Sequence, residues 1–536
     1  MHRNSNRENR EIPEVSAHEE AERADNQTWV TSAMHAAGKS DESIVPTKLV
    51  NNAAAEPSGD AEAAEPVEER DSRTGNAQRA NLDRAQPRKQ RSSGLLGIRE
   101  RAAKDRHAQF SNLMHHVTPE LLQSSFLDLR KAAAPGVDEV TWVQYAQRLE
   151  DHIEDLHARV QSGAYRAKPS KRAYILKSDG KLRPLGIASL EDKIVQRAVR
   201  TVLEQIYERD FLGFSYGYRP RRGAHDALDA LSYVIKRRNV SWILDADIRG
   251  FFDNLNHEWL MKFLEHRVQD RRMLRLIRKW LKAGVSEDGE WSQTDVGTPQ
   301  GAVISPLLAN VYLHYALDLW VNQWRKREAV GQIYIVRYAD DFVIGFSHHA
   351  DALALKKQLG ERLERFDLEL HPGKTRLIEF GKYAETRRRN RGEGKPESFD
   401  FLGFTHRCGR TRQGGYYTVD RTTVAKRMRT TLAEIKKKLN QRRHDPLYQT
   451  GIWLRQVVRG WYQYYAVPGN WDRLEQFRTA VAKLWRQAIH RRSQKARIRW
   501  TWPRLSRLFA SYLPAKQILH PYPDDRFLGR PARGAV

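Results

Sequence analysis

Hydrophobic and polar residues follow two different periods along the middle of the chain. Short apolar runs such as Trp242–Leu244 and Ile333–Val336 have the length and composition of buried strands. Longer segments such as Glu191–Tyr207 and Ala352–Phe366 carry apolar residues at the spacing of one helix face. This mixture predicts an α/β or α+β architecture across residues 110–410.

The two ends of the chain differ from this middle part and from each other. From Glu11 to Arg70 there are 14 acidic and 4 basic residues, without a sustained apolar period, which predicts a disordered leader. From Arg421 to Trp500 there are 20 basic and 4 acidic residues. Apolar residues at helical spacing from Val424 to Leu439 predict a long basic helix there.

The composition narrows the class of protein. The 536 residues carry a formal charge of +26, which indicates a polyanionic partner such as nucleic acid. No apolar run approaches the roughly 18–20 residues of a membrane span, and no signal peptide is evident. The single cysteine, Cys408, excludes an internal disulfide framework and a multi-cysteine zinc site. A cytoplasmic nucleic-acid-binding protein without a membrane partner is therefore expected.

Acidic residues are placed at the ends of predicted strands. Asp245 and Asp247 end one apolar strand and share a face, because side chains alternate along a strand. Asp340 and Asp341 occupy the turn of a hairpin over Ile333–Phe346. Carboxylates at adjacent strand ends suit a pair of Mg²⁺ ions that support nucleotidyl transfer. The alternative is an ordinary solvated acidic turn.

Five motifs around these acids resemble those of reverse transcriptases. In chain order they are DADIRGFFD (245–253), GTPQG (297–301), YADD (338–341), HPGKT (371–375) and FLGF (401–404). The resemblance implies an RNA-directed DNA polymerase that uses two Mg²⁺ ions, with Mn²⁺ able to replace them. It also implies an α+β right-hand fold, with fingers and an antiparallel palm sheet with helices, followed by an all-helical basic thumb/maturase domain.

The resemblance also assigns roles to the acids. Asp247, Asp340 and Asp341 correspond to the catalytic, metal-binding aspartates, and the carbonyl of Ile248 would complete the metal shell. Asp245 is expected to be a structural acid at a strand end.

Five further residues would bind the nucleotide. Lys177 and Arg183, in a hairpin that resembles the fingers, would hold the triphosphate, although exposed hairpin charges are the alternative. Phe252 falls at the position that excludes a ribose 2′-hydroxyl; the alternative is a core aromatic. Gln300 would lie near the incoming nucleotide and template. Lys374 would donate a proton to pyrophosphate, or is simply a surface lysine.

Other segments resemble bacterial group II intron-encoded proteins. They are APGVDEVTW (134–142), FSYGYRPRRGAHDAL (214–228), a basic insertion between Leu260 and Val296, and VVRGWYQYYAVPGN (457–470). This implies binding of group II intron RNA, an RNA template with a DNA primer, deoxynucleotides and target DNA. The expected location is a cytoplasmic ribonucleoprotein that associates with the nucleoid during mobility. The oligomeric state is left open.

Basic and aromatic residues near the last of these segments are candidate RNA contacts. Arg455 and Arg459 would contact phosphates, and Trp461 would stack on a base or pack in a helical core. The short length after this region and the single cysteine lead us to expect no H-N-H endonuclease domain, so that priming would need another strand. The expected domains are a leader (1–95), an N-terminal extension with fingers (96–240), a palm (241–410), a thumb/maturase domain (411–495) and a DNA-binding tail (496–536).

Several alternatives remain open at this point. A reverse transcriptase domesticated for defence or for a diversity-generating element would carry the same palm motifs. A maturase-only splicing factor would bind RNA without polymerising, although the intact Asp247, Asp340, Asp341 and Gln300 disfavour it. An RNA replicase is disfavoured by Phe252 and by YADD.

Overall fold

The computed structural model describes residues 92–176, 182–287, 290–292, 297, 301–411 and 413–528. Residues 1–91 of the expected leader lie outside this range, and the first described helix begins at Ser92. Among the described helices, none is both long and apolar enough to cross a membrane.

Helices and one small sheet make up the N-terminal half. The helices are α3 (Ser92–Lys104), η1 (Met114–His116), α4 (Pro119–Leu127), α5 (Trp142–Ala146), α6 (Leu149–Ser162), α7 (Leu190–Asp210), α8 (Ala224–Arg237), α9 (His257–Glu265) and α10 (Arg271–Lys282). The sheet has the order β2-β1-β4-β5, built from β1 (Ser170–Leu176), β2 (Leu182–Ile187), β4 (Val285–Glu287) and β5 (Glu290–Ser292). The predicted helix over Glu191–Tyr207 is confirmed as part of α7.

A second four-stranded sheet lies at the centre of the chain. Its order is β6-β7-β3-β8, from β3 (Trp242–Asp247), β6 (Ile333–Tyr338), β7 (Asp341–Phe346) and β8 (Arg376–Glu379). All of its pairings are antiparallel. The accompanying helices are α11 (Ser305–Leu313), the π-helical turn η2 (His314–Asp318), α12 (Leu319–Arg327), α13 (His349–Glu364) and α14 (Ala384–Asn390). The predicted hairpin is confirmed.

The central sheet is buried on both faces, which explains why its strands are so apolar. Along β3, Leu244 and Ala246 belong to one hydrophobic core, which also contains the N-terminal helices. The intervening Ile243 belongs to a second core, which extends into the C-terminal helices, and Val343 of β7 does the same. The sheet therefore separates the two main cores of the protein.

The C-terminal part begins with a three-stranded sheet and continues as helices. The strands, in the order β11-β10-β9, are β9 (Phe399–Phe401), β10 (Phe404–Arg410) and β11 (Tyr417–Thr423). The helices are α15 (Ala425–Gln441), α16 (Leu447–Tyr465), α17 (Trp471–His490), α18 (Gln494–Arg499), α19 (Trp502–Tyr512) and α20 (Pro523–Leu528). The expectation of an all-helical region from residue 411 was wrong, because β11 pairs with β10 along seven positions. The helices begin at Ala425.

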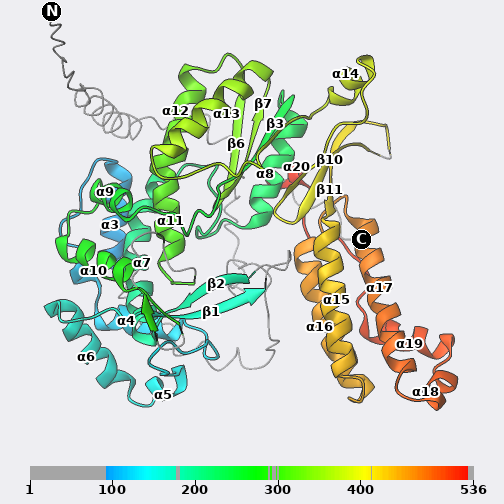
Figure 1. The fold of residues 1–536 in the computed structure, drawn as a ribbon, viewed down its shortest axis with the longest axis horizontal. Coiled ribbons are helices and arrows are strands. Elements are labelled where there is room, and N and C mark those ends of the chain that lie inside the picture. The colour runs from blue at the N-terminus through cyan, green and yellow to red at the C-terminus, as the bar shows by residue number, and fades with distance from the viewer. Residues whose placement is uncertain are drawn as a thin grey trace, which may run out of the picture.

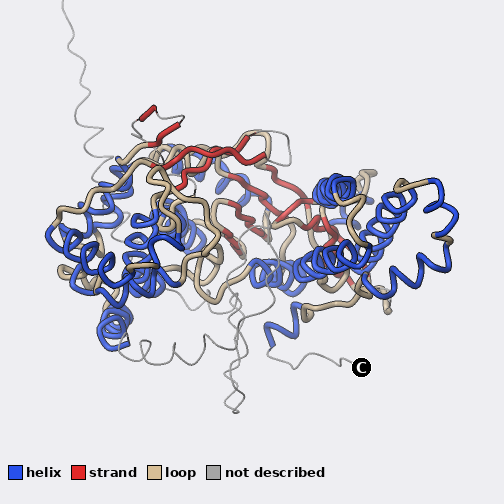
Figure 2. The backbone as a smooth tube through the Cα atoms, turned by 90° about the horizontal axis from the view of Figure 1, so that it is seen from below, coloured by secondary structure: helices blue, strands red, loops and turns tan. Residues whose placement is uncertain are grey.

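Two helical bodies lie on either side of the central sheet. Figure 1 shows the hairpin β1–β2 with α4 to α7 on one side, and α15 to α19 on the other, with β3, β6 and β7 above and between them. The view from below separates the same two helical bodies, with most of the strands between them (Figure 2). This arrangement leaves the carboxyl end of β3 and the β6–β7 turn between the two bodies.

Candidate functional site: the acidic end of the central sheet

The central sheet brings two of the predicted catalytic acids directly opposite each other. In the antiparallel pairing of β3 with β7, Asp247 lies opposite Asp341. Because side chains alternate along a strand, Asp247 shares its face with Ile243, and Asp341 shares its face with Val343. Both Ile243 and Val343 belong to the core on the C-terminal side. The two carboxylates therefore lie on the face of the sheet that packs against α8.

The turn that carries Asp340 is tight and closely packed. Ala339 adopts a left-handed conformation with φ of 57°, which is uncommon for a residue other than glycine. The segment around Gly217 presses against this turn, since a Cβ atom added to Gly217 would overlap the backbone nitrogen of Ala339. The turn that presents Asp340 and Asp341 is thus held by a part of the chain more than a hundred positions earlier.

The acids repel one another. Enclosure by the surrounding protein, followed by repulsion from the carboxylates of Asp340 and Asp247, raises the pKa of Asp341 to about 7, although its side chain still reaches solvent. Such an excess of negative charge is the environment that a bound cation relieves. Across the described ranges, no three acidic, histidine or cysteine side chains are gathered closely enough to enclose a metal ion by themselves.

A lysine lies against the acids. Lys374 donates a hydrogen bond through Nζ to Oδ2 of Asp247 at 2.5 Å. Its loop is anchored to the same residue, because the His371 backbone N–H donates to the Asp247 carbonyl at 2.8 Å. Burial lowers the pKa of Lys374, but the hydrogen bond to Asp247 and the nearby acids outweigh that effect and raise it above its usual value. The residues present thus fit a positive charge, whether an ammonium or a metal ion.

Two neighbours of Asp247 have backbone or side-chain partners of their own. Ile248 is buried and forms an isolated antiparallel bridge with Leu370. Asp245 forms an ion pair with Arg376 at 3.5 Å, and burial raises its pKa to about 6. This pairing favours the expected structural role of Asp245.

The predicted steric-gate residue lies beside the GTPQG motif. Phe252 is half-buried, with its ring centroid 5.3 Å from that of Phe251. Gly297 has φ of 89°, and a Cβ atom there would lie 2.9 Å from the Phe252 carbonyl and 2.7 Å from that of Asp253. Only glycine fits this position without strain. The backbone that carries Phe252 is therefore packed tightly against the start of the motif.

Three predicted nucleotide-binding residues lie wholly or partly outside the described structure. Lys177 and Gln300 lie outside the described residues. Arg183 lies on β2, with Ile175 as its partner on β1, but its side chain is outside the described part of the structure.

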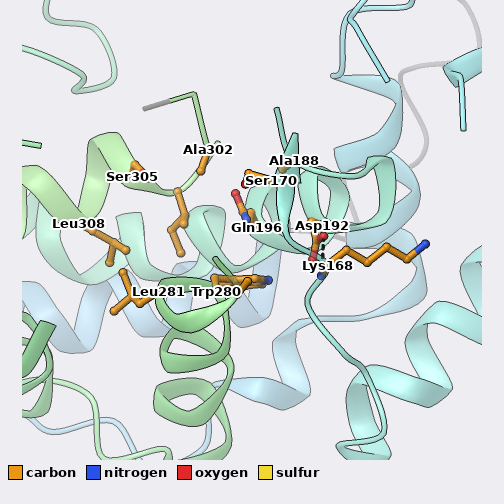
Figure 3. Close-up of a pocket in the computed structure, with 12 residues that line it drawn as sticks. Lys168, Ser170, Ala188, Asp192, Gln196, Trp280, Leu281, Ala302, Ser305 and Leu308 are labelled. Carbon is orange, nitrogen blue, oxygen red and sulfur yellow. Dashed lines mark hydrogen bonds between the residues drawn. The ribbon is translucent and has the colours of Figure 1, made fainter. Parts of the chain in front are cut away.

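A small cavity lies where the hairpin β1–β2 meets α7, α10 and the start of α11 (Figure 3). Its volume of about 20 Å³ suits a single water molecule. Beside it, Gln196 accepts a hydrogen bond from the Val303 backbone N–H at 3.0 Å, which ties α7 to the chain just after GTPQG. Asp192 accepts from the Ser189 hydroxyl at 2.5 Å and from the Tyr165 hydroxyl. Burial raises the pKa of Asp192. These polar contacts connect α7 to Tyr165 and to the chain at Val303.

The three candidate RNA contacts have different surroundings. Trp461 is buried, with its ring stacked 4.2 Å from that of Phe477, which favours the packing alternative over base stacking. Arg455 donates to the carbonyls of Ser511 and Tyr512 at the end of α19. Arg459 is exposed on α16.

The aromatic segment 457–470 connects the C-terminal helices to the strands that precede them, a role that motif analysis did not predict. Tyr464 donates from its hydroxyl to the Leu402 carbonyl at 2.8 Å, within the FLGF motif. Asn470 is fully buried; it accepts from the Thr423 backbone N–H at 3.0 Å and donates to the Tyr465 carbonyl at 2.8 Å. The only available signal was the close succession of Tyr, Gly and Asn, which does not distinguish a joint from a binding surface.

The comparison with known proteins agrees with the motifs and the fold. Residues 175–406 match the family described as reverse transcriptase (RNA-dependent DNA polymerase), which uses divalent metal ions. Protein YkfC of Escherichia coli is 35% identical over 278 residues, which are 45% of this chain and 72% of YkfC. The group II intron-encoded protein LtrA of Lactococcus lactis is 42% identical over 181 residues, 33% of this chain and 29% of LtrA. Nuclear intron maturase 3 of Arabidopsis thaliana is 25% identical over 44% of this chain and 35% of its own length.

The matched segments therefore span less than two thirds of LtrA and of the plant maturase, but more than two thirds of YkfC. The chain belongs to the reverse transcriptase family, in its group II intron-encoded branch.

Proposed function

We propose that this protein copies RNA into DNA at the acidic end of the central sheet, with Asp247, Asp340 and Asp341 as its catalytic carboxylates. The observation that carries the proposal is the cross-strand pairing of Asp247 with Asp341, with Asp340 in the adjoining turn. The excess negative charge there, with the pKa of Asp341 raised to about 7, supports a cation site.

The three carboxylates would hold divalent ions, Mg²⁺ by preference and Mn²⁺ as a substitute, together with the Ile248 carbonyl. When bound, the ions would lower the pKa of the primer 3′-hydroxyl and neutralise charge on the nucleotide phosphates. Lys374, which donates a hydrogen bond to Asp247, would protonate the pyrophosphate as it leaves. Phe252 would crowd a ribose 2′-hydroxyl, while Lys177, Arg183 and Gln300 would hold the nucleotide.

We assign the domains from the arrangement of the two helical bodies around the central sheet. We assign residues 96–240 to an N-terminal extension with fingers and residues 241–410 to the palm. The basic helices from α15 onward would serve as thumb and maturase domain, with residues 496–536 as a DNA-binding tail. The helix α15 lies in the helical body across from the hairpin β1–β2 (Figure 1). Its exposed basic residues support contact with a nucleic-acid backbone.

The partner that we propose is a group II intron RNA. Its support is the likeness to LtrA, a group II intron-encoded protein, and to intron maturases. The protein would bind this RNA, assist its splicing, and then copy it into DNA as part of a ribonucleoprotein that engages target DNA.

Primer extension on an RNA template tests the polymerase. With Mg²⁺ and deoxynucleotides, the wild type should extend a DNA primer, and Asp340→Ala with Asp341→Ala should abolish extension while RNA affinity is kept. A matched control is Asp151→Ala with Asp155→Ala, which removes two exposed acids of α6 and should leave extension unchanged. Extension by the Asp340/Asp341 variant would contradict the metal-site assignment.

Splicing of an intron RNA tests the maturase proposal separately. The same Asp340/Asp341 variant should stimulate splicing as well as the wild type does, since metal-dependent polymerisation is not needed to fold the RNA. Failure of the wild type to bind the intron of its own locus more tightly than an unrelated structured RNA would contradict the proposal.

A further inference from the structure

Arg337, the residue just before YADD, is fully buried together with an acid. Its side chain and that of Asp318 are both 0% exposed. The Arg337 guanidinium donates from Nε to Asp318 Oδ1 at 2.7 Å and from Nη2 to Oδ2 at 2.5 Å. A buried charged pair of this kind is costly to desolvate and is weak evidence for stability alone, so another reason for its presence must be sought.

The remaining N–H groups of Arg337 are all occupied. Nη2 donates to the Ser215 hydroxyl at 2.7 Å, and Nη1 donates to Asn310 Oδ1 at 3.0 Å. Nη1 also donates to the Ala339 carbonyl at 2.9 Å. A guanidinium has five N–H donors, and here all five have acceptors. The geometry of the fork is therefore fully determined by its surroundings.

The bond to the Ala339 carbonyl connects this network to the proposed catalytic acids. That carbonyl belongs to the peptide group that joins Ala339 to Asp340. Ala339 holds an unfavourable left-handed conformation with φ of 57°, which persists only where the surroundings impose it. The Arg337 guanidinium is one such constraint, because rotation of the peptide would break its hydrogen bond.

Several other elements meet at the same point. Asn310 of α11, besides accepting from Arg337, donates to the Gly217 carbonyl at 2.7 Å. The Arg337 backbone pairs with the segment before Gly217, because its N–H donates to Phe214 and its carbonyl accepts from Tyr216. Asp318 ends the π-helical turn η2, an irregularity that is often found at functional sites. The network therefore joins α11, η2 and the segment 214–217 to the YADD turn.

We propose that Arg337 is a positioning residue for the catalytic turn, and that its guanidinium aims Asp340 by fixing the peptide between Ala339 and Asp340. This inference rests on the proposed function of Asp340 and Asp341. Arg337 touches neither substrate nor metal in this proposal; it acts through the turn. Only arginine supplies enough donors at the required angles. A lysine would keep the ion pair with Asp318 and lose the hydrogen bond to the Ala339 carbonyl.

The test compares Arg337→Lys with Arg421→Lys. Arg421 is a matched control, because it is also buried and forms a 2.5 Å ion pair with a buried acid, Asp229. Three quantities would be measured: the melting temperature, the rate of single-nucleotide addition, and the dissociation constant of Mn²⁺ by water-proton relaxation on the full-length protein bound to primer and template.

Arg337→Lys is expected to slow nucleotide addition at least thirtyfold and to weaken Mn²⁺ binding at least fivefold, with primer–template affinity unchanged. Arg421→Lys is expected to lower the melting temperature by a similar amount while Mn²⁺ affinity and rate per folded molecule stay within twofold of the wild type. Equal behaviour of the two variants would overturn the positioning role and leave Arg337 a purely structural residue.

Two further arms keep the test decisive. If Arg337→Lys does not fold, Ser215→Ala removes one acceptor from the guanidinium and retains the ion pair; it should weaken Mn²⁺ binding measurably, and wild-type affinity would overturn the inference. The wild type and the Asp340→Ala, Asp341→Ala variant are measured alongside. Equal Mn²⁺ affinity in those two would contradict the proposed function itself, whereas loss of affinity in the aspartate variant alone would contradict only the role of Arg337.

Discussion

Lys374 and Asp247, which are 127 positions apart in the chain, are joined by a hydrogen bond of 2.5 Å between Nζ and Oδ2. The lysine side chain is largely exposed and the aspartate is mostly buried. The ammonium group thus occupies a position next to a carboxylate that we propose as a metal ligand. This position should affect both the affinity of the site for a cation and the rate of nucleotide addition.

Replacement of Lys374 by methionine should separate these consequences. Mn²⁺ should bind the free protein several-fold more tightly, because the ammonium no longer competes for Asp247. Nucleotide addition should slow by about a hundredfold, the lower end of what a general acid contributes. Mn²⁺ titration and single-turnover extension measure the two effects, with Lys357→Met on the exposed side of α13 as control. Unchanged Mn²⁺ affinity would show that Lys374 does not compete with the cation.

Phe252→Ala should relax the choice of sugar. The half-buried ring packs against the edge of the core, and the contact with Gly297 is made by the Phe252 backbone, so removal of the ring opens space without removing a main core residue. The ratio of kcat/KM for a deoxynucleotide to that for its ribonucleotide should fall at least tenfold. Phe251→Leu, a change to the neighbouring buried ring, should alter stability and leave this ratio unchanged. A ratio that does not move in Phe252→Ala would assign Phe252 to packing alone.

Gly297→Ala should impair the protein more than a methyl group usually does. The new Cβ atom would lie 2.7 Å from the Asp253 carbonyl, and φ at this position is 89°. Both the contact and the conformation disfavour alanine, so the melting temperature should fall and extension should weaken. Gly360→Ala on α13, where nothing lies within 4 Å, should instead raise stability by about 0.5–1 kcal/mol. Thermal unfolding of the two variants measures the difference.

Arg455 and Arg459, two candidates from one sequence motif, should behave differently. Arg459→Gln should weaken RNA binding and reduce the salt dependence of affinity by about one ion, because we propose that this exposed residue contacts a phosphate. Arg455→Gln should mainly destabilise, by about 1–2 kcal/mol, since its guanidinium binds carbonyls at the end of α19. Filter binding at several salt concentrations, beside thermal unfolding, distinguishes the two. Equal losses of RNA affinity would contradict the distinction.

Local patterns predicted the central sheet because its strands are buried on both faces. The apolar runs before Asp247 and around YADD predicted buried strands, and alternation predicted that Asp245 and Asp247 share one face. The cross-strand pairing of Asp247 with Asp341 could not be predicted from the sequence, because the register of two strands depends on contacts between segments almost a hundred positions apart.

Sequence analysis missed residues whose surroundings are unusual for their residue type. Arginine is among the least buried residue types, so nothing marked Arg337 as fully enclosed. Trp461 was ambiguous because aromatic residues at helical spacing serve both cores and nucleic-acid surfaces. The strand β11 was missed because two of its three buried positions, Arg421 and Thr423, are polar, so Tyr417–Thr423 lacks the apolar alternation of a strand.

A half-buried pair of histidines should make the free energy of unfolding depend on pH. The rings of His225 on α8 and His520 near the C-terminus are stacked with centroids 3.7 Å apart, and His225 Nε2 contacts the Tyr464 carbonyl at 2.8 Å. Burial, followed by the neighbouring His520, lowers the pKa of His225 to about 4; burial also lowers that of His520. Arg421 and Arg526, which face the pair from β11 and α20, act in the same direction.

Protonation and folding are linked, and this linkage sets the direction in which pH changes the free energy of unfolding. A lowered pKa means that the unfolded chain takes up protons more readily than the folded protein between about pH 6.5 and pH 4. The stabilising effect of neutral His225 is complete above that range and is lost as the pH falls through it, by about 3 kcal/mol at most. His225→Gln should therefore flatten the fall in melting temperature between pH 7 and pH 5 that the wild type shows. His444→Gln, a change at a histidine outside this cluster, should keep the wild-type slope, and a wild-type slope in His225→Gln would contradict the assignment.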